Sequence, residues 1–319
     1  MKKLLGFTLF IAIIMLIAPL WAIEQPQSVS AAAPVVSATD KTEKKTGADT
    51  FKVLTDGKTE EFSRAEYIFG VVAAEMPALY HEEALKAQAV AAYTFAVIKK
   101  EQNTALEYDI TSDHTVDQSF ITEQKAREKW GDNAEEYIAK IKKAVAETEG
   151  ELICYKGEPI TAFYHAISGG KTEDPKNVWG KALPYLKPTL STGDTLAKNY
   201  ITEVIFTAEE LAEKLSGEVK LSGEPEKFFS DSKTTESGTV SEIKVCGEKI
   251  SGFKIQSLLS LRSANFEVKY ADEKFIFTVK GAGHGVGMSQ NGANFMANQG
   301  SSYKEILTYY YNGCSVEKK

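Results

Sequence analysis

Residues 84–92, with the sequence ALKAQAVAA, constrain the fold more strongly than any other segment of this 319-residue chain. Two acids precede the run and two lysines follow it at residues 99–100, which is the charge order that a helix dipole favours. We therefore expect a helix over residues 81–100. Because five of the nine central residues are alanine, neighbouring elements can pack close to the helix axis. The helix should lie in the interior of the protein.

A second helix is predicted just upstream. Ser63 and Glu66 have the spacing of a capping box and stand ahead of a set of apolar residues with helical periodicity. This helix must end near Glu75, because Met76 precedes Pro77 and a residue before proline is pushed out of the α region. The sequence therefore places Glu75 in the last turn of a helix.

The rest of the chain mixes short helices and strands. Expected elements are a helix over 134–148, a hairpin of 151–155 with 160–164, a loop at 168–170, a strand near 204–206, a helix from 207, strands around 240–245, a helix near 253–261, a hairpin of 266–270 with 275–279, and helices near 288–298 and 303–310. No βαβ regularity is visible, so the fold class is α+β. We expect mixed helices and antiparallel strands in one large or two-lobed domain with a cleft.

The charge balance excludes one class of partner. The chain has 37 basic and 44 acidic residues, a net charge of −7. The first 50 residues hold five lysines and four acids, so the remaining 269 carry a net charge of −8. Nucleic-acid recognition relies on clustered Lys and Arg that displace counterions from phosphates. We therefore expect no nucleic-acid partner.

The N-terminus carries an export or anchoring signal. Two lysines precede an uncharged run of 20 residues over 4–23, about the length of a helix that crosses a bilayer. The run is longer than the apolar core of most signal peptides and lacks a good cleavage site. We therefore expect a retained transmembrane anchor over 4–23 with a cytoplasmic stub at 1–3. A signal peptide is the alternative. Residues 24–50 are mostly small, polar and charged and predict a flexible linker. The body, 51–319, is then extracytoplasmic.

Glu75 is the carboxylate with the most informative surroundings. It follows an apolar helical segment, and no basic residue stands beside it in the sequence. A carboxyl in apolar surroundings has a raised pKa, which suits a general acid at neutral pH. A capping role for the next helix and a buried, hydrogen-bonded glutamate are the alternatives.

Two loops supply further candidates. Tyr164 stands at the end of an expected strand, and Ser168, Gly169 and Gly170 follow in a loop that can present side chains and backbone N–H groups to a substrate. No nucleophile-elbow motif surrounds Ser168, so substrate positioning is the favoured role. His284 lies among alternating glycines, where it can contact substrate or make structural hydrogen bonds. With four histidines and no zinc-binding spacing, we expect no metal site.

Four motifs, in this order, resemble the SpoIID/LytB family. They are residues 70–77 (GVVAAEMP), 83–92 (EALKAQAVAA), 168–173 (SGGKTE) and 283–293 (GHGVGMSQNGA). The resemblance runs from about residue 60 to residue 313 and so covers nearly the whole body of the chain.

The resemblance implies a lytic transglycosylase that needs no cofactor and acts on peptidoglycan glycan strands stripped of stem peptides. Glu75 occupies the position of the family's catalytic glutamate, which would cleave the MurNAc–GlcNAc bond as acid and then base and leave a 1,6-anhydroMurNAc end. The implied substrate-binding residues are Tyr93, Tyr164, Ser168, Gly169, Gly170, His284 and Gln290. The implied setting is engulfment during sporulation, in the space between mother cell and forespore. There the chain would be a single-pass membrane protein, with a SpoIIP-like amidase and a SpoIIM-like membrane protein as partners.

One position departs from the family pattern. Members commonly carry an arginine where this chain has Tyr93, and tyrosine cannot supply a fixed positive charge. Either another cation compensates, or the enzyme is slower, or the protein mainly acts as a scaffold. Two other functions therefore stay open: a non-catalytic peptidoglycan-binding activator of a cell-wall amidase, and a glycan hydrolase that uses water.

Overall fold

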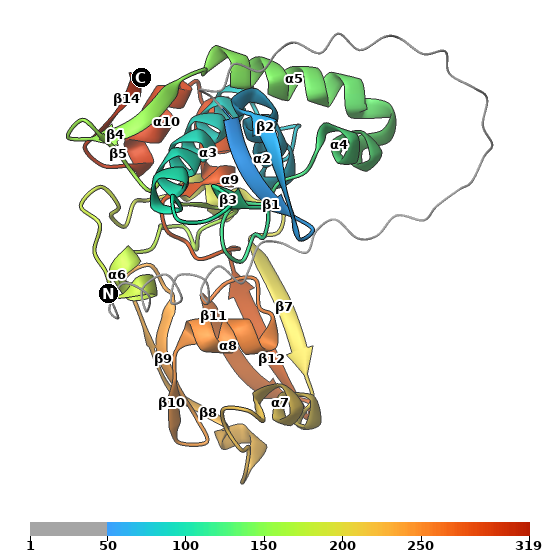
Figure 1. Cartoon of the computed structure of the whole chain (residues 1–319). Coiled ribbons are helices and arrows are strands. Elements are labelled where there is room, and N and C mark those ends of the chain that lie inside the picture. Colours follow the sequence, from blue (N-terminus) through green and yellow to red (C-terminus); the bar gives the residue numbers. More distant parts are fainter. Residues whose placement is uncertain (1–49) are drawn as a thin grey trace.

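The computed structural model describes residues 50–319, which form an upper and a lower lobe in Figure 1. The predicted stub (1–3), the predicted anchor (4–23) and all but the last residue of the predicted linker (24–50) lie outside the described residues. Within residues 50–319, no helix combines the length and the apolar character that crossing a bilayer requires. The mixture of helices and strands agrees with the predicted α+β class.

Helix α3 (Glu82–Gln102) is the centre of the upper lobe. His81 caps its start, its alanines are almost all fully buried, and it packs against α2 (Arg64–Glu75), α5 (Ala134–Glu147), α9 (Gln290–Asn298), α10 (Tyr303–Tyr310) and β4 (Glu151–Tyr155). Small side chains allow five elements to approach one helix, as the sequence predicted. The boundaries of α2 are also as predicted: the capping box of Ser63 and Glu66 is formed, and Met76 ends the helix in an extended conformation.

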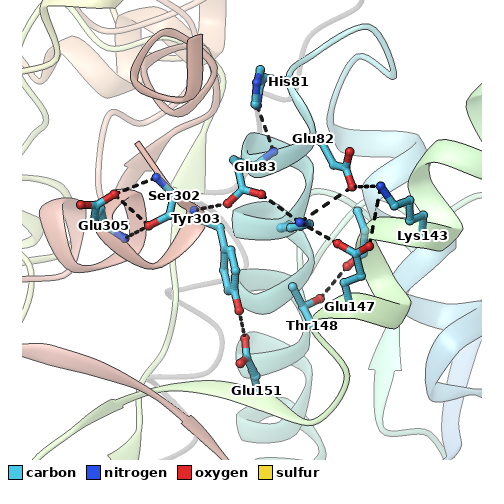
Figure 2. Close-up of polar contacts among 12 residues, drawn as sticks. His81, Glu82, Glu83, Lys143, Glu147, Thr148, Glu151, Ser302, Tyr303 and Glu305 are labelled. Carbon is cyan, nitrogen blue, oxygen red and sulfur yellow. Dashed lines mark hydrogen bonds and ion pairs between the residues drawn. The ribbon is translucent and has the colours of Figure 1, made fainter. Parts of the chain in front are cut away.

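An ion-pair network fixes the first turns of α3 to its neighbours (Figure 2). Lys86 contacts Glu83 of α3 (2.8 Å) and Glu147 of α5 (2.6 Å). The other oxygen of Glu83 accepts the backbone N–H of Tyr303 at the start of α10 (2.8 Å), and the Tyr303 hydroxyl donates to Glu151 of β4 (2.8 Å). The network therefore joins α3, α5, β4 and α10 and holds the N-terminal end of α3 in place.

The remaining elements of the upper lobe complete its core. They are β1 (Thr50–Thr55), β2 (Lys58–Ser63), β3 (Ile110–Thr111), α4 (Glu123–Trp130), β5 (Glu158–Pro159), β6 (Tyr164–His165), α6 (Pro175–Trp179), β13 (Met288–Ser289) and β14 (Cys314–Lys318), with short 3₁₀ turns at Gly131–Asn133 and Thr192–Leu196. Sheet orders are β2-β1-β3, β13-β6 and β14-β4-β5. Most pairs are antiparallel, as predicted, but β1 with β3 and β13 with β6 are parallel.

One predicted hairpin is only partly right. β4 has the predicted bounds, but its hairpin partner is Glu158–Pro159 and not residues 160–164. The chain then diverges, because Tyr164 and His165 pair with Met288 and Ser289 instead of continuing the hairpin. The distant pairing brings the loop at 168–170 next to the start of α9.

The lower lobe has a hydrophobic core of its own. It contains β7 (Ile201–Phe206), α7 (Ala208–Leu215), a 3₁₀ turn (Pro225–Lys227), β8 (Phe229–Thr234), β9 (Val240–Val245), β10 (Glu248–Ile250), α8 (Gly252–Leu259), β11 (Phe266–Ala271) and β12 (Lys274–Lys280). Two three-stranded antiparallel sheets, β11-β12-β7 and β10-β9-β8, enclose that core. The chain enters and leaves at one point, since the N–H of Gly281 donates to the carbonyl of Tyr200 (2.8 Å).

Gly70 in α2 should tolerate no larger residue. A Cβ there would lie 2.3 Å from Cε2 of Phe120 and 2.4 Å from the carbonyl oxygen of Ile121. We expect Gly70→Ala to lower the free energy of unfolding by about 1–3 kcal/mol, measured by urea denaturation. Gly217→Ala is the matched control, because no atom lies within 4 Å of its added Cβ, and it should change stability by no more than about 0.5 kcal/mol. Equal effects of the two substitutions would contradict the packing argument.

Candidate active site

Glu75 lies at the C-terminal end of α2, partly open to solvent. Its Oε1 accepts the backbone N–H of Ser119 (2.7 Å) from the loop that follows β3. Desolvation by the surrounding protein raises the pKa of the Glu75 carboxyl. Hydrogen bonds from Ser119 and Gln290 and the charge of His114 oppose that rise without cancelling it. A carboxyl with a raised pKa can both donate and accept a proton near neutral pH.

A chain of uncharged side chains surrounds Glu75. Gln290 of α9 hydrogen-bonds Glu75 and also donates from Nε2 to Oε1 of Gln88 on α3 (3.3 Å). The Tyr164 hydroxyl of β6 donates to Oε1 of Gln118 (2.9 Å), and Nε2 of Gln118 donates to the Tyr67 hydroxyl of α2 (3.1 Å). The structure therefore brings together three predicted site residues, Glu75, Tyr164 and Gln290.

The two tyrosines of this network stay neutral. Burial raises the pKa of Tyr164 well above its usual value, and the charge of Glu75 adds to that effect. Burial likewise raises the pKa of Tyr67, with a smaller contribution from Glu75. Asp117, a carboxylate in the loop that carries Ser119, forms an ion pair with Lys99 and accepts the N–H of Thr111 (2.9 Å). The hydrogen-bond partners of Glu75 are thus neutral, and it has no carboxylate partner in the network, unlike the paired carboxylates of most glycosidases.

His284 stands beside this network and is also neutral. Burial, together with the charge of His165, lowers the pKa of His284 to about 3, and burial lowers the pKa of His165 to about 4. Nδ1 of His284 accepts the N–H of Val286 (3.0 Å), so the ring proton is on Nε2. The ring packs against Trp179 (5.3 Å between centroids) and Phe163 (6.2 Å). A neutral imidazole among aromatic rings can stack and donate but cannot act as a cation.

Ser168 has a structural partner that the sequence did not reveal. The Ser168 hydroxyl donates to Oδ2 of Asp194 (2.6 Å), and its N–H donates to the same oxygen (2.8 Å). Oδ1 of Asp194 accepts the Ser289 hydroxyl at the start of α9 (2.7 Å). Burial raises the pKa of Asp194, and these hydrogen bonds lower it in part. Ser168 is therefore held as a donor that positions the 168–170 loop, and not as a free nucleophile.

The loop glycines meet the lower lobe. A Cβ on Gly169 would lie 2.2 Å from Nδ2 of Asn265, and Gly170 has a φ of +100°, which favours glycine. Ser168, Gly169 and His284 line a small cavity where the two lobes meet. A much larger hollow of about 660 Å³ lies between β2, α2, α4 and α5, and Glu75 is not among its lining residues. The substrate-contacting residues predicted on these loops stay predictions.

Tyr93 lies on another side of α3. It is five residues beyond Gln88, about 140° around the helix. Its ring packs against Phe51 (6.4 Å between centroids), and the guanidinium of Arg64 stands over it (5.4 Å). Tyr93 therefore takes part in the packing between α3 and the first hairpin, and its contact with substrate stays a prediction.

Several residues of the site were not predicted. Gln88 was visible as the only polar uncharged residue inside the alanine-rich run, and a buried amide there needs hydrogen-bond partners. Gln118, Ser119 and Asp194 come from loops whose positions depend on distant contacts, and no local signal marked them. Among residues 50–319, no three His, Cys, Asp or Glu side chains cluster in the manner of metal ligands.

The raised pKa of Glu75 predicts a pH-dependent effect of Glu75→Gln on stability. A raised folded-state pKa means that protonation stabilises the fold. This contribution is complete below the pKa of an unfolded glutamate, about 4.3, and is lost as the pH rises through the folded-state pKa. The amide keeps an acceptor for Ser119 and does not ionise. The Tm advantage of Glu75→Gln over wild type should therefore grow with pH from about 4 and level off above the folded-state pKa.

Circular dichroism melts from pH 4 to 9 test this expectation. Glu60→Gln, on the exposed strand β2, is the control for replacing a carboxyl by an amide. A Tm difference for Glu75→Gln that does not vary with pH would show that the carboxyl is not desolvated.

Comparison with known proteins identifies the family. The family described as "SpoIID: Stage II sporulation protein" matches residues 55–155. The chain is 37% identical over 262 residues to stage II sporulation protein D of Bacillus subtilis (strain 168), and the match covers 81% of this chain and 76% of that protein. It is also 37% identical over 262 residues to stage II sporulation protein D of Bacillus amyloliquefaciens, and that match covers 81% of this chain and 75% of the relative. It is 27% identical over 301 residues to the amidase enhancer of B. subtilis, covering 77% of this chain and 40% of that protein. The predicted family resemblance is confirmed, and the chain belongs to the SpoIID family.

Proposed function

We propose that this protein is a lytic transglycosylase that cleaves MurNAc–GlcNAc bonds in peptidoglycan strands stripped of stem peptides. The observation that carries the proposal is the environment of Glu75: a partly exposed residue whose single carboxyl has a raised pKa and neutral hydrogen-bond partners. A reaction that uses one group first as acid and then as base needs this arrangement and needs no second carboxylate.

The reaction follows from that single carboxyl. Protonated Glu75 gives its proton to the glycosidic oxygen, and the bond from that oxygen to C1 of MurNAc breaks. The resulting carboxylate takes the proton of the MurNAc 6-hydroxyl, whose oxygen bonds to C1. The products are a free GlcNAc 4-hydroxyl end and a 1,6-anhydroMurNAc end, no water is consumed, and Glu75 is protonated again.

The neutral groups around Glu75 suit a sugar substrate. Gln290 and Tyr164 lie in its network, and the aromatic group of Trp179, Phe163 and His284 offers faces on which a pyranose ring can stack. Ser168, Gly169 and Gly170 shape the loop beside them. We place glycan contacts on these residues, whereas Tyr93, which packs between α3 and the first hairpin, is left out.

The proposal includes a cellular setting. As a member of a sporulation family, the protein would act during engulfment, held by its N-terminal anchor in the cell membrane with residues 51–319 in the space between mother cell and forespore. An amidase of the SpoIIP type would supply the stripped strands, and a SpoIIM-like membrane protein would complete the assembly. An acidic body gains little from long-range attraction to anionic wall polymers, so anchoring would supply the local concentration.

A second candidate is a non-catalytic peptidoglycan-binding activator of a cell-wall amidase. The similarity to the B. subtilis amidase enhancer supports it. The two candidates differ in their need for Glu75 chemistry, because an activator that works by binding does not transfer a proton.

Product analysis should decide between these functions. We expect the full chain, incubated with stripped glycan strands, to release products with 1,6-anhydroMurNAc ends. Mass spectrometry detects these ends because they are 18 Da lighter than the ends that a water-using enzyme would leave. Glu75→Gln should lower the rate about 10²–10⁴-fold, since that is the usual contribution of a general acid–base group. Glu60→Gln, on the exposed strand β2, should retain wild-type activity.

Two results would contradict the proposal. Hydrolytic ends would indicate a glycan hydrolase. Absence of cleavage, with amidase stimulation equal in wild type and Glu75→Gln, would favour the activator.

A further inference from the structure

The end of α2 is an unfavourable place for a carboxylate. The last carbonyl groups of a helix carry partial negative charge, which disfavours an anion nearby. Glu75 is the last residue of α2, and that helix has no basic residue in its own last turn. A charge from another element is therefore needed to offset the helix end when Glu75 is ionised.

Lys129 of α4 supplies a positive charge at the C-terminal end of α2. Its Nζ donates to the carbonyl of Ala73 (3.1 Å), two residues before Glu75 in the same helix turn. Lys129 is an exposed residue, and its ammonium lies near the ring of Trp130 (5.9 Å to the centroid). Burial lowers the pKa of Lys129, and the charge of Glu75 partly restores it, so the two groups influence each other.

The other groups that face Glu75 do not take this role. Tyr67 on α2 and Tyr164 on β6 are neutral phenols, and α3 and α9 present the amides of Gln88 and Gln290. His114 lies in the exposed loop after β3, and its charge lowers the pKa of Glu75 from outside α2. Lys129 is the basic side chain that is hydrogen-bonded to the last turn of α2.

We infer that Lys129 is a positioning residue for Glu75: its ammonium, held on the Ala73 carbonyl, supplies the positive charge that Glu75 needs in its carboxylate form. The inference rests on the proposed function, in which Glu75 must pass through that form before it accepts the proton of the 6-hydroxyl. Lys129 would act through Glu75 and contact no reacting atom.

The chain offers a matched control in Lys140. From α5, its Nζ donates to the carbonyls of Ala78 (2.9 Å) and Tyr80 (2.6 Å), in the turn between α2 and α3. Burial also lowers the pKa of Lys140, but its charged neighbours are Glu82 and Glu136, and not Glu75. Loss of Lys140 should therefore disturb the local fold in a similar way without changing the charge at Glu75.

The test is a carboxyl titration of the full chain labelled with ¹³C-glutamate, in which the Glu75 signal is identified by its absence from Glu75→Gln. We expect Lys129→Met to move the Glu75 titration midpoint to higher pH, because the ionised form loses its neighbouring cation. Lys129→Arg should restore the wild-type midpoint, and Lys140→Met should leave it unchanged. Lys129→Gln is a second neutral variant with the same expectation, in case Lys129→Met does not fold.

The activity profile provides a second measurement. The alkaline limb of the pH–rate curve should move to higher pH in Lys129→Met together with the Glu75 midpoint, and Lys129→Arg should reverse the change. A Glu75 midpoint that stays in place in both neutral Lys129 variants, or that moves equally in Lys140→Met, would overturn the inference. Retained cleavage by Glu75→Gln would instead overturn the proposed function, while the carboxyl titration would still decide the role of Lys129.

Discussion

Close packing around α3 is the constraint on which the rest of the upper lobe depends. Five elements contact this helix, and they can do so because most of the side chains between them end at Cβ. The same packing buries Gln88, an amide that must then find partners inside the protein. Its partner is Gln290, so the alanine-rich helix fixes both the spacing of the scaffold and the position of a side chain that contacts Glu75.

Glu75 itself reflects a balance between desolvation and polar contacts. Complete removal from water would leave the carboxyl protonated, and strong pairing with cations would leave it permanently ionised. The hydrogen bonds from Ser119 and Gln290 favour the carboxylate, but they do not cancel the effect of desolvation on its pKa. Desolvation and these opposing contacts together keep both protonation states within reach, as a group that donates and then recovers a proton requires.

Local signals in the sequence predicted the elements that carry Glu75, and distant contacts decided the rest. The capping box at Ser63 and the Met76–Pro77 step fixed α2 correctly, and the charge order around the alanine run fixed α3. The strand predicted at 160–164 failed because Tyr164 pairs with Met288, more than 120 residues away. Asp194 and Ser119 had no signal for the same reason: their roles arise from hydrogen bonds to partners that only the fold brings near. Tyr93 stands where the family commonly has arginine, and the guanidinium of Arg64 lies over its ring, a contact that no local signal predicted.

The lower lobe joins the upper one at a single point of entry and exit of the chain. Its chain enters at Tyr200 and leaves at Gly281, two residues joined by a backbone hydrogen bond, and it encloses its own core. Segments whose ends lie together tolerate insertion and replacement. An insertion within the lower lobe therefore leaves the chain path through α2 and α3 unchanged. The lobes also meet through side chains, since the Thr235 hydroxyl donates to Glu173 (2.6 Å) and the Ser237 hydroxyl donates to the carbonyl of Thr172 (2.7 Å).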